Sequence, residues 1–438
     1  MFESLYTADE MRAAEQGHDV EAMMERAGRV VAEAVLHRYP AARRIGGVCG
    51  KGANGGDGRI ALRILAEAGR DAGEEIDGAD VVIDALFGTG FHGAPRDDAA
   101  RQIERVNEAG APVVAVDLPS GVDASTGEVA GAAVQADVTV TMHARKVGLA
   151  VAPGRFHAGD VEVADIGIEQ RRTRHGLVTE EVLGLVPRKR AEDTKYRAGA
   201  VLVVGGAPGL TGAVCLAAEA AFRADAGYVA VATPSASLPI VEARLLEAVK
   251  APLERVDELA ERASALAIGP GLGRGDESRV LVRRLLGELR LPAVVDADAL
   301  FELEPREWPA PRVLTPHSGE LGRLLGRESD WVDAHRLEAV QQAAETYRCV
   351  VLLKGADTLV AAPGEGVLVS SSGTPALAVA GTGDVLTGIV AAFLAKGVDA
   401  RMAAAAAAYA HGRAAQLVPH TRGVIASDLI AALPKALP

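Results

Sequence analysis

The segment Ala380–Gly388, AGTGDVLTG, decides how the C-terminal half of this 438-residue chain is interpreted. A Gly-Thr-Gly turn leads into Asp384, and the apolar run that follows, DVLTGIVAAFLAK, predicts a helix. Backbone N–H groups at such a helix start converge on an anion, and the helix dipole favours negative charge there. An ionised acid in this place can accept a proton from a hydroxyl group while the amides hold a phosphoryl group. A plain turn with Asp384 as the helix cap would have the same sequence, so the neighbouring segments must decide.

Four further turns in this half are rich in glycine or polar residues, and each follows a candidate strand. They read LKGADTL at 353–359, IGPGLG at 268–273, TPHSGE at 315–320 and VDADAL at 295–300. Lys354 can meet a phosphate, Thr358 can hydrogen-bond a nucleotide, and His317 stands beside Glu320. The carboxyl ends of parallel strands share one edge of a sheet, where α/β proteins bind ligands. We therefore expect a ligand site along this edge, although each turn alone could be structural.

Aliphatic runs and helical patterns alternate along the whole chain, which predicts βαβ units and parallel sheets, an α/β fold. The expected strands are Ile45–Cys49, Val81–Leu86, Val113–Leu118, Val138–Met142, Val201–Val204, Tyr228–Thr233, Ala265–Ile268, Ala293–Asp296, Arg312–Thr315 and Val350–Lys354. The series breaks once, in a charged segment between residues 166 and 195. We expect two domains, residues 1–172 and 173–438.

Composition limits the classes of function. Lys plus Arg number 46 and Asp plus Glu number 59, a net charge of −13, so neither nucleic acid nor an anionic membrane is an expected partner. Cys49, Cys215 and Cys349 are far apart, which excludes a disulfide framework and a CxxC zinc site. The first residues contain acids and no apolar core, so no signal peptide is expected. These features favour a cytoplasmic location.

The motifs of the C-terminal half, in their order, resemble the ribokinase-like superfamily and in particular its nucleotide-dependent NAD(P)H-hydrate dehydratases. The resemblance implies a ribokinase-like αβα domain that dehydrates (S)-NAD(P)H hydrate with ADP, giving AMP and phosphate, with Mg²⁺ on the phosphates. It implies that Asp384 is the base. The implied nucleotide contacts are Lys354, Gly355, Ala356, Asp357, Thr358 and Gly383, and the implied hydrate contacts are Ala213, Gly271, Gly273, His317 and Asp384. One departure is DTKYRAG at 193–199, where the family commonly has His-Lys-Gly, so Lys195 receives no role.

Three turns in the N-terminal half are also rich in glycine or oxygen donors. They read GKGANGGDG at 50–58, VIDALFGTGFHG at 82–93 and VDLPSGVD at 116–123. The first matches neither a P-loop nor GxGxxG. Together the turns gather Asn54, Asp84, Asp117 and Ser120, hard oxygen donors that suit K⁺ or Mg²⁺. Each turn alone is more simply read as an ordinary βα connection.

These three turns resemble the NAD(P)H-hydrate epimerase family of the YjeF N-terminal type. The resemblance implies a Rossmann-like αβα domain that interconverts the R and S hydrates. It implies that Asn54, Asp84 and Ser120 hold K⁺. The implied hydrate contacts are Ala53, Asn54, Gly55, Gly56, Asp57, Gly88, Thr89, Gly90, Phe91, His92, Gly93, Ala94 and Asp117. Ala53 departs from the family's usual Asn, which puts one contact in doubt. Asp117 is our candidate base.

The two resemblances together imply a bifunctional enzyme that repairs hydrated NAD(P)H, because an epimerase supplies a stereospecific dehydratase with the epimer that it cannot use. The expected ligands are NAD(P)H hydrate, ADP, Mg²⁺ and K⁺, and we expect a homo-oligomer. One alternative is a ribokinase-like kinase for a small alcohol, such as a vitamin precursor, since it would share AGTGD. Another is that the N-terminal half is a non-catalytic nucleotide-binding module.

Overall fold

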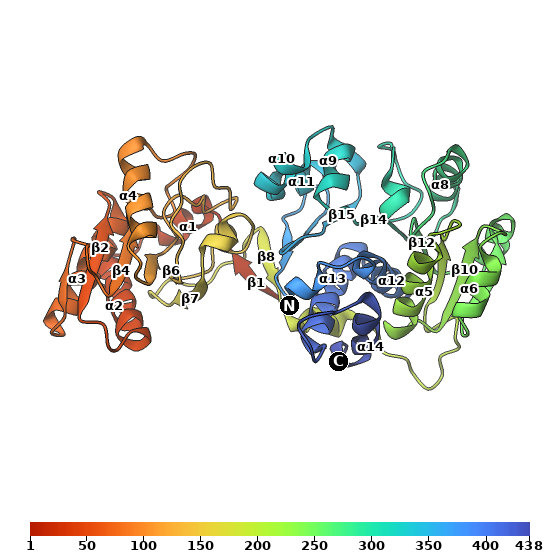
Figure 1. The fold of residues 1–438 in the computed structure, drawn as a ribbon, viewed down its shortest axis with the longest axis horizontal. Helices are drawn as coiled ribbons and strands as arrows, with labels where there is room; N and C mark the ends of the chain where they lie inside the picture. Colours follow the sequence, from red (N-terminus) through yellow and green to blue (C-terminus); the bar gives the residue numbers. More distant parts are fainter. The chain divides into compact units, whose positions relative to one another are not determined.

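The computed structural model describes residues 1–438, and its contacts divide the chain into two compact units. The smaller unit contains Ser4–Gly176. The larger contains Leu177–Val332 and Glu338–Pro438, and Met1–Glu3 also belongs to it. Each unit is an α/β structure with its own sheet, as expected from the alternating pattern (Figure 1). No helix is both long and apolar enough to span a lipid bilayer.

The smaller unit is built on a six-stranded sheet in the order β3-β2-β4-β5-β6-β7, with every neighbouring pair parallel. Its strands are β2 (Arg44–Cys49), β3 (Asp71–Gly73), β4 (Val81–Ala85), β5 (Val113–Val116), β6 (Val138–Met142) and β7 (Asp160–Ala164). Its helices are α1 (Ala8–Glu15), α2 (Val20–Arg38), α3 (Ala53–Glu67) and α4 (Asp97–Glu108), with short 3₁₀ turns at Val147–Leu149 and Gly154–His157. All residues of β4, β5 and β6 are buried, so the near-continuous apolar runs reflect central parallel strands.

The larger unit is built on an eleven-stranded sheet in the order β1-β8-β17-β16-β15-β14-β13-β12-β9-β10-β11. Its strands are β1 (Phe2–Leu5), β8 (His175–Val178), β9 (Ala200–Val204), β10 (Tyr228–Thr233), β11 (Val249–Pro252), β12 (Ala265–Ile268), β13 (Ala293–Val295), β14 (Arg312–Leu314), β15 (Val350–Leu353), β16 (Thr358–Ala361) and β17 (Leu368–Ser370). The pairings from β11 through β15 are parallel, whereas β16 pairs antiparallel with both of its neighbours. The parallel part aligns the turns that carry the motifs at one edge.

The helices of the larger unit include three long ones that follow the last strand. They are α5 (Thr211–Arg223), α6 (Leu238–Arg244), α7 (Val256–Ala260), α8 (Asp276–Glu288), α9 (Ser318–Leu325), α10 (Ser329–Ala334), α11 (Arg336–Tyr347), α12 (Thr382–Ala395), α13 (Ala400–Leu417) and α14 (Ala426–Ala436). Short 3₁₀ turns lie at Glu180–Leu185, Leu253–Arg255, Ala297–Leu300 and Pro375–Leu377. Helices α5, α12, α13 and α14 pack on one another (Figure 1). Helix α12 is almost wholly buried, so its N-terminus is held firmly against the sheet.

All ten strands predicted from the sequence are present, with ends that differ by a residue or two. The strands that the sequence did not reveal are β1, β3, β7, β8, β11, β16 and β17. Several of these are short, and β3, β7 and β11 lie at or beside sheet edges, where fewer residues are buried and the apolar pattern is weak.

Candidate active sites

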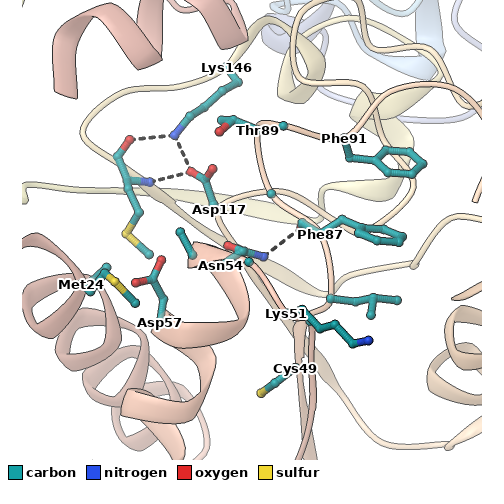
Figure 2. Close-up of a pocket in the computed structure, with 18 of the residues that line it drawn as sticks. Met24, Cys49, Lys51, Asn54, Asp57, Phe87, Thr89, Phe91, Asp117 and Lys146 are labelled. Carbon is teal, nitrogen blue, oxygen red and sulfur yellow. Dashed lines mark hydrogen bonds and ion pairs between the residues drawn. The ribbon is translucent and has the colours of Figure 1, made fainter. Parts of the chain in front are cut away.

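A cavity of about 890 Å³ opens at the carboxyl ends of the strands in the smaller unit (Figure 2). Nine of the predicted epimerase residues line it: Ala53, Asn54, Asp57, Gly88, Thr89, Gly90, Phe91, His92 and Asp117. Six others do not: Gly55, Gly56, Asp84, Gly93, Ala94 and Ser120. The segment 50–58 thus lines the cavity with residues 50–54 and with Asp57. Gly55 serves packing, because a Cβ atom there would overlap the carbonyl oxygen of Gly50.

Asp117 is the most constrained acid in this cavity. It follows β5 with a φ of 67°, a left-handed conformation that is uncommon for residues other than glycine and directs the carboxylate toward the end of β6. There its Oδ1 accepts hydrogen bonds from the backbone N–H of Met142 at 3.1 Å and from the hydroxyl of Thr141 at 3.2 Å. Lys146 forms an ion pair with the same oxygen, so three donors converge on one side of the Asp117 carboxyl group (Figure 2).

Lys146 is a functional candidate that the sequence analysis missed. Its side chain is fully buried, and its Nζ also donates to Thr141 Oγ1 at 3.0 Å and to the Met142 carbonyl at 2.8 Å. An ammonium group with no exposure requires partners of this kind, so the pair with Asp117 is a built feature of the cavity. The sequence signal was a single lysine after a predicted strand, which by itself carries no information.

Asn54, Asp84 and Ser120 form one connected network of oxygen atoms and amides. The Ser120 backbone N–H and hydroxyl donate to the two carboxylate oxygens of Asp84, at 2.7 and 2.6 Å. The Phe87 N–H donates to the Ser120 hydroxyl at 2.9 Å, and the Asn54 side-chain amide donates to the Phe87 carbonyl at 2.8 Å. Burial raises the pKa of Asp84 to about 6, despite the hydrogen bonds from Ser120. The structure therefore brings the three predicted cation ligands together.

Asp57 lies on α3, three residues after Asn54, and lines the same cavity. The residue is 9% exposed, and its Oδ1 has no hydrogen-bond partner. Burial raises its pKa to about 8, and the nearby carboxylates of Asp117 and Glu15 contribute to the rise. Glu15, at the end of α1, lines the same cavity, and burial raises its pKa as well. The raised pKa values of these two acids result from burial and neighbouring charges, which the sequence does not display.

In the larger unit, the segment AGTGDVLTG at 380–388 contains the start of α12. Gly381 caps this helix with a φ of 92°, and the Thr382 hydroxyl donates to the carbonyls of Leu377 and Val379 at 2.9 and 3.0 Å. Asp384 lies in the first helical turn. Gly388 faces α5 so closely that a Cβ atom there would overlap the Ala217 carbonyl oxygen. Gly381 thus allows the turn before α12, and Gly388 allows α12 to pack closely on α5.

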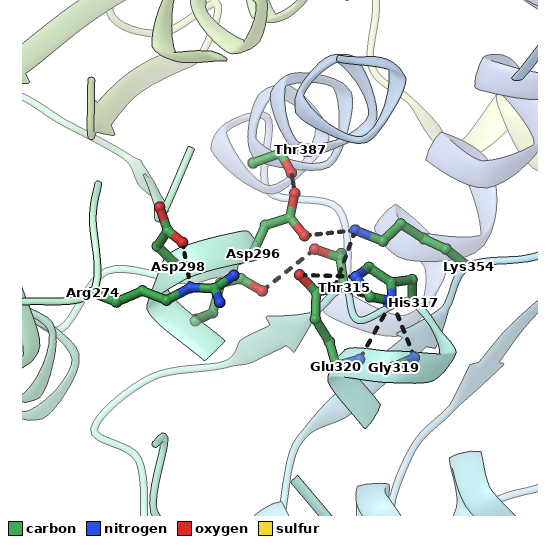
Figure 3. Close-up of polar contacts among 10 residues, drawn as sticks. Arg274, Asp296, Asp298, Thr315, His317, Gly319, Glu320, Lys354 and Thr387 are labelled. Atoms are coloured by element: carbon green, nitrogen blue, oxygen red, sulfur yellow. Dashed lines mark hydrogen bonds and ion pairs between the residues drawn. The ribbon is translucent and has the colours of Figure 1, made fainter. Parts of the chain in front are cut away.

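Asp296, at the end of β13, connects the predicted nucleotide lysine to this helix (Figure 3). Its Oδ1 accepts a hydrogen bond from Lys354 Nζ at 2.8 Å, and its Oδ2 accepts one from Thr387 of α12 at 2.7 Å. Glu320 Oε2 lies 3.7 Å from the same ammonium group. Burial disfavours the charge on Lys354, but Asp296 and Glu320 outweigh it and raise the pKa of the lysine. Lys354 is therefore a charged residue that is only partly exposed and is held by acids, and it is not part of a free surface turn.

Asp384 lies among these charges. Burial and the carboxylate of Asp296 raise its pKa to about 7, whereas Lys354 lowers it. Asp298 contributes to the rise and is itself held in place, because its Oδ2 accepts from the Gly273 N–H at 2.9 Å and its Oδ1 from Arg274 Nε at 2.8 Å. The group that the sequence predicted to be kept ionised by the helix start thus titrates near neutral pH. Burial, which the sequence does not display, is the reason.

His317 caps helix α9 (Figure 3). Its Nδ1 accepts a hydrogen bond from the Gly319 N–H at 3.1 Å, and Glu320 Oε2 accepts one from the His317 N–H at 2.9 Å. The His317 ring remains about half exposed, and burial of the rest lowers its pKa. A neutral ring whose Nε2 lies 3.5 Å from Glu320 Oε1 is available for contact with a substrate.

The remaining predicted residues of this unit are placed as follows. A Cβ atom on Gly383 would lie 3.5 Å from Lys354 Nζ, and one on Gly271 would lie 3.3 Å from the Ala213 methyl group. Gly355, Ala356 and Asp357 form the turn between β15 and β16, and Thr358 begins β16. No group of three or more His, Cys, Asp or Glu side chains is arranged to hold a metal ion.

Each of the two units matches a known protein family. A family described as NAD(P)H-hydrate dehydratase matches residues 201–436, and a family described as YjeF-related protein N-terminus matches residues 20–73 and 70–148. The chain is similar to the bifunctional NAD(P)H-hydrate repair enzyme Nnr of Moorella thermoacetica, with 39% identity over 95% of this chain and 92% of that protein. Its identity to the protein of the same name from Escherichia coli is 32%, over 98% and 93% of the two chains.

A solved structure agrees for the larger unit. The ADP/ATP-dependent NAD(P)H-hydrate dehydratase of Bacillus subtilis, co-crystallised with ATP and Mg²⁺, is 31% identical with a TM-score of 0.55. The match covers 59% of this chain and 96% of that one. The small-alcohol kinase alternative is not favoured, because the relatives that match nearly the whole chain, and so both units, are named bifunctional NAD(P)H-hydrate repair enzymes. The chain therefore belongs to the family of bifunctional NAD(P)H-hydrate repair enzymes.

Proposed function

We propose a division of labour between the two sites of this NAD(P)H-hydrate repair enzyme. The cavity of the smaller unit interconverts the R and S hydrates, and the α12 start of the larger unit handles the S hydrate and ADP. The observation that supports this most is that each unit pairs a buried aspartate with a lysine inside its site, Asp117 with Lys146 and Asp296 with Lys354. Each site also holds an acid whose pKa is raised by burial, Asp57 and Asp384, and such groups cluster at catalytic sites.

In the dehydratase site, Asp384 is the proposed base. It takes the proton of the ring hydroxyl as that oxygen attacks the terminal phosphorus of ADP, and AMP leaves. The ring then carries a phosphate ester in place of a hydroxyl, which is a better leaving group, and phosphate departs with the neighbouring ring proton to restore the dihydropyridine. Lys354, next to Gly383, holds the phosphates as a fixed positive charge.

Mg²⁺ fits this site only in company with the nucleotide. No cluster of side chains could bind it alone, and both oxygens of Asp296 are already engaged by Lys354 and Thr387. Mg²⁺ commonly takes one or two carboxylates, with phosphate oxygens and water completing its shell. Glu320 is the proposed carboxylate, and the bound ion would neutralise charge on the phosphates.

K⁺ fits the network of the smaller unit by donor chemistry. Asn54, Asp84 and Ser120 offer amide, carboxylate and hydroxyl oxygens, which hard cations prefer. A cation there would also offset the burial that raises the pKa of Asp84 to about 6. Its proposed contribution is to fix the loop at Phe87 that lines the cavity.

The test uses the purified full chain with ADP, Mg²⁺ and K⁺ and follows NADH absorbance. We expect both hydrate epimers to be converted completely. Asp384→Asn should keep nucleotide binding and lose dehydration by about 100-fold or more, the usual contribution of a general base. Asp117→Ala should dehydrate the S hydrate normally but consume the R hydrate only at its spontaneous rate. A stable phosphorylated product, with no NADH formed, would contradict the repair function.

A further inference from the structure

The epimerase cavity contains an acid whose chemistry the proposed function does not use. Asp57 is more than nine-tenths buried, lines the cavity and leaves its Oδ1 without a hydrogen-bond partner. A buried carboxyl oxygen without a partner is costly unless the group is neutral or meets a ligand. Met24 packs against the neighbouring Gly56, where a Cβ atom would overlap its terminal methyl, so an apolar side chain lies beside Asp57 (Figure 2).

Asp57 and Asp117 line the same cavity but differ in their partners. Glu15 on α1 and Lys146 after β6 line it too, and Lys146 forms an ion pair with Asp117. Asp57 has no such cation, and both Asp117 and Glu15 repel a negative charge on it. Two neighbouring acids whose environments separate them in this way are suited to donate and to accept a proton in one reaction.

The hydrate's ring carbon bears both the hydroxyl group and the ring nitrogen, so it is a hemiaminal. Its configuration can invert by ring opening. A base removes the hydroxyl proton, the carbon–nitrogen bond breaks to leave an aldehyde, and an acid protonates the nitrogen. Rotation exposes the other aldehyde face, and ring closure reverses both proton transfers. The hydroxyl oxygen and the nitrogen are bonded to one carbon, so this route needs an acid and a base that are close together.

We infer that Asp57 is the acid that protonates the ring nitrogen while Asp117 acts as base on the ring hydroxyl, so that epimerisation proceeds by ring opening. Both residues return to their starting states when the ring closes, and no co-reactant is consumed. This inference rests on the epimerase function proposed above.

The first test is Asp57→Asn in the full chain, with the ratio of R to S hydrate followed by chromatography in the absence of ADP. The amide keeps the size of the side chain but cannot give up a proton, so kcat should fall by about 100-fold or more with a small change in KM. The wild-type rate should decline above about pH 8 as Asp57 loses its proton, and the residual activity of the variant should lack this decline.

Asp97→Asn supplies the matched control, because Asp97 is an exposed residue in the first turn of α4 and does not line the cavity. It should epimerise at the wild-type rate. The Asp57→Asn variant should still dehydrate the S hydrate, which shows that the larger unit is intact. The melting temperature of the variant shows whether the smaller unit is folded.

The second test is epimerisation in water enriched in the heavy oxygen isotope. Ring opening leaves the substrate oxygen in the product, whereas loss and return of the hydroxyl group would replace it. Replacement at every turnover overturns the ring-opening route, and wild-type kcat in Asp57→Asn overturns the acid role. If the wild-type chain itself fails to accelerate epimerisation, the proposed function fails instead.

Discussion

The carboxyl group of Asp384 should set the pH dependence of dehydration between pH 6 and 8. Burial and the Asp296 carboxylate raise its pKa to about 7, and Lys354 partly opposes them. A base works only when ionised, and a group of this pKa is ionised to about a tenth at pH 6 and about nine-tenths at pH 8. The rate should therefore rise about tenfold over this interval. An aspartate with an ordinary pKa near 4 would be fully ionised throughout and give a flat profile.

The assay is kcat/KM for the S hydrate at saturating ADP and Mg²⁺, read as NADH absorbance, because this ratio reports the pKa values of the enzyme before the hydrate binds. Asp298→Asn removes one of the charges that raise the pKa of Asp384, so its profile should shift to lower pH. The amide oxygen can still accept the hydrogen bond from the Gly273 N–H. Asp276→Asn makes the same charge change at the exposed start of α8 and should leave the profile in place.

Two outcomes would refute this reasoning. A wild-type profile that stays flat from pH 6 to pH 8 would show that Asp384 does not titrate there or is not the base. A profile in Asp298→Asn that coincides with the wild-type one would show that neighbouring charge does not control the group.

Three further predictions concern stability and ions. Lys146→Met leaves the Asp117 carboxylate buried without its cation, which should lower the free energy of unfolding of the smaller unit by about 3–5 kcal/mol in urea titration and abolish epimerisation. Gly388→Ala brings a methyl group against the Ala217 carbonyl, so the larger unit should lose about 1–3 kcal/mol of stability, seen as a lower melting temperature; an unchanged value would mean that α5 can move away freely. Replacing K⁺ with a large organic cation should slow epimerisation but not dehydration, and Ser120→Ala should reduce the response to added K⁺.

The central part of both sheets could be predicted from the sequence. Strands such as Val201–Val204 are buried on both faces, so every residue is apolar and the signal is strong. The candidate sites followed from the same fact, because parallel strands deliver their glycine-rich turns to one edge. Asn54, Asp84 and Ser120 come from three separate segments. In the structure, Phe87 links Asn54 to Ser120, and Ser120 bonds directly to Asp84.

The partners of the candidate residues could not be predicted, because they depend on which side chains are brought together across the fold. Lys146 reaches Asp117 from 29 positions away, and Thr387 reaches Asp296 from 91 positions away. The neutral state of Asp57 was equally hidden, since it results from burial and from two other acids. A sequence displays the identity of a titratable group but not the dielectric or the charges around it.

The position of β1 has a consequence for how the chain is made. Residues 2–5 are synthesised long before most of the larger sheet. Their neighbour in that sheet is β8, whose other neighbour is β17 at residues 368–370. The smaller unit can be completed during synthesis, because its sheet uses only strands up to residue 164. Strand β1 can meet β8 once residue 178 has emerged, but this pair cannot join the rest of the larger sheet until β17 has also been made. The larger sheet is therefore completed late in synthesis, when β17 meets a pair of strands made long before it.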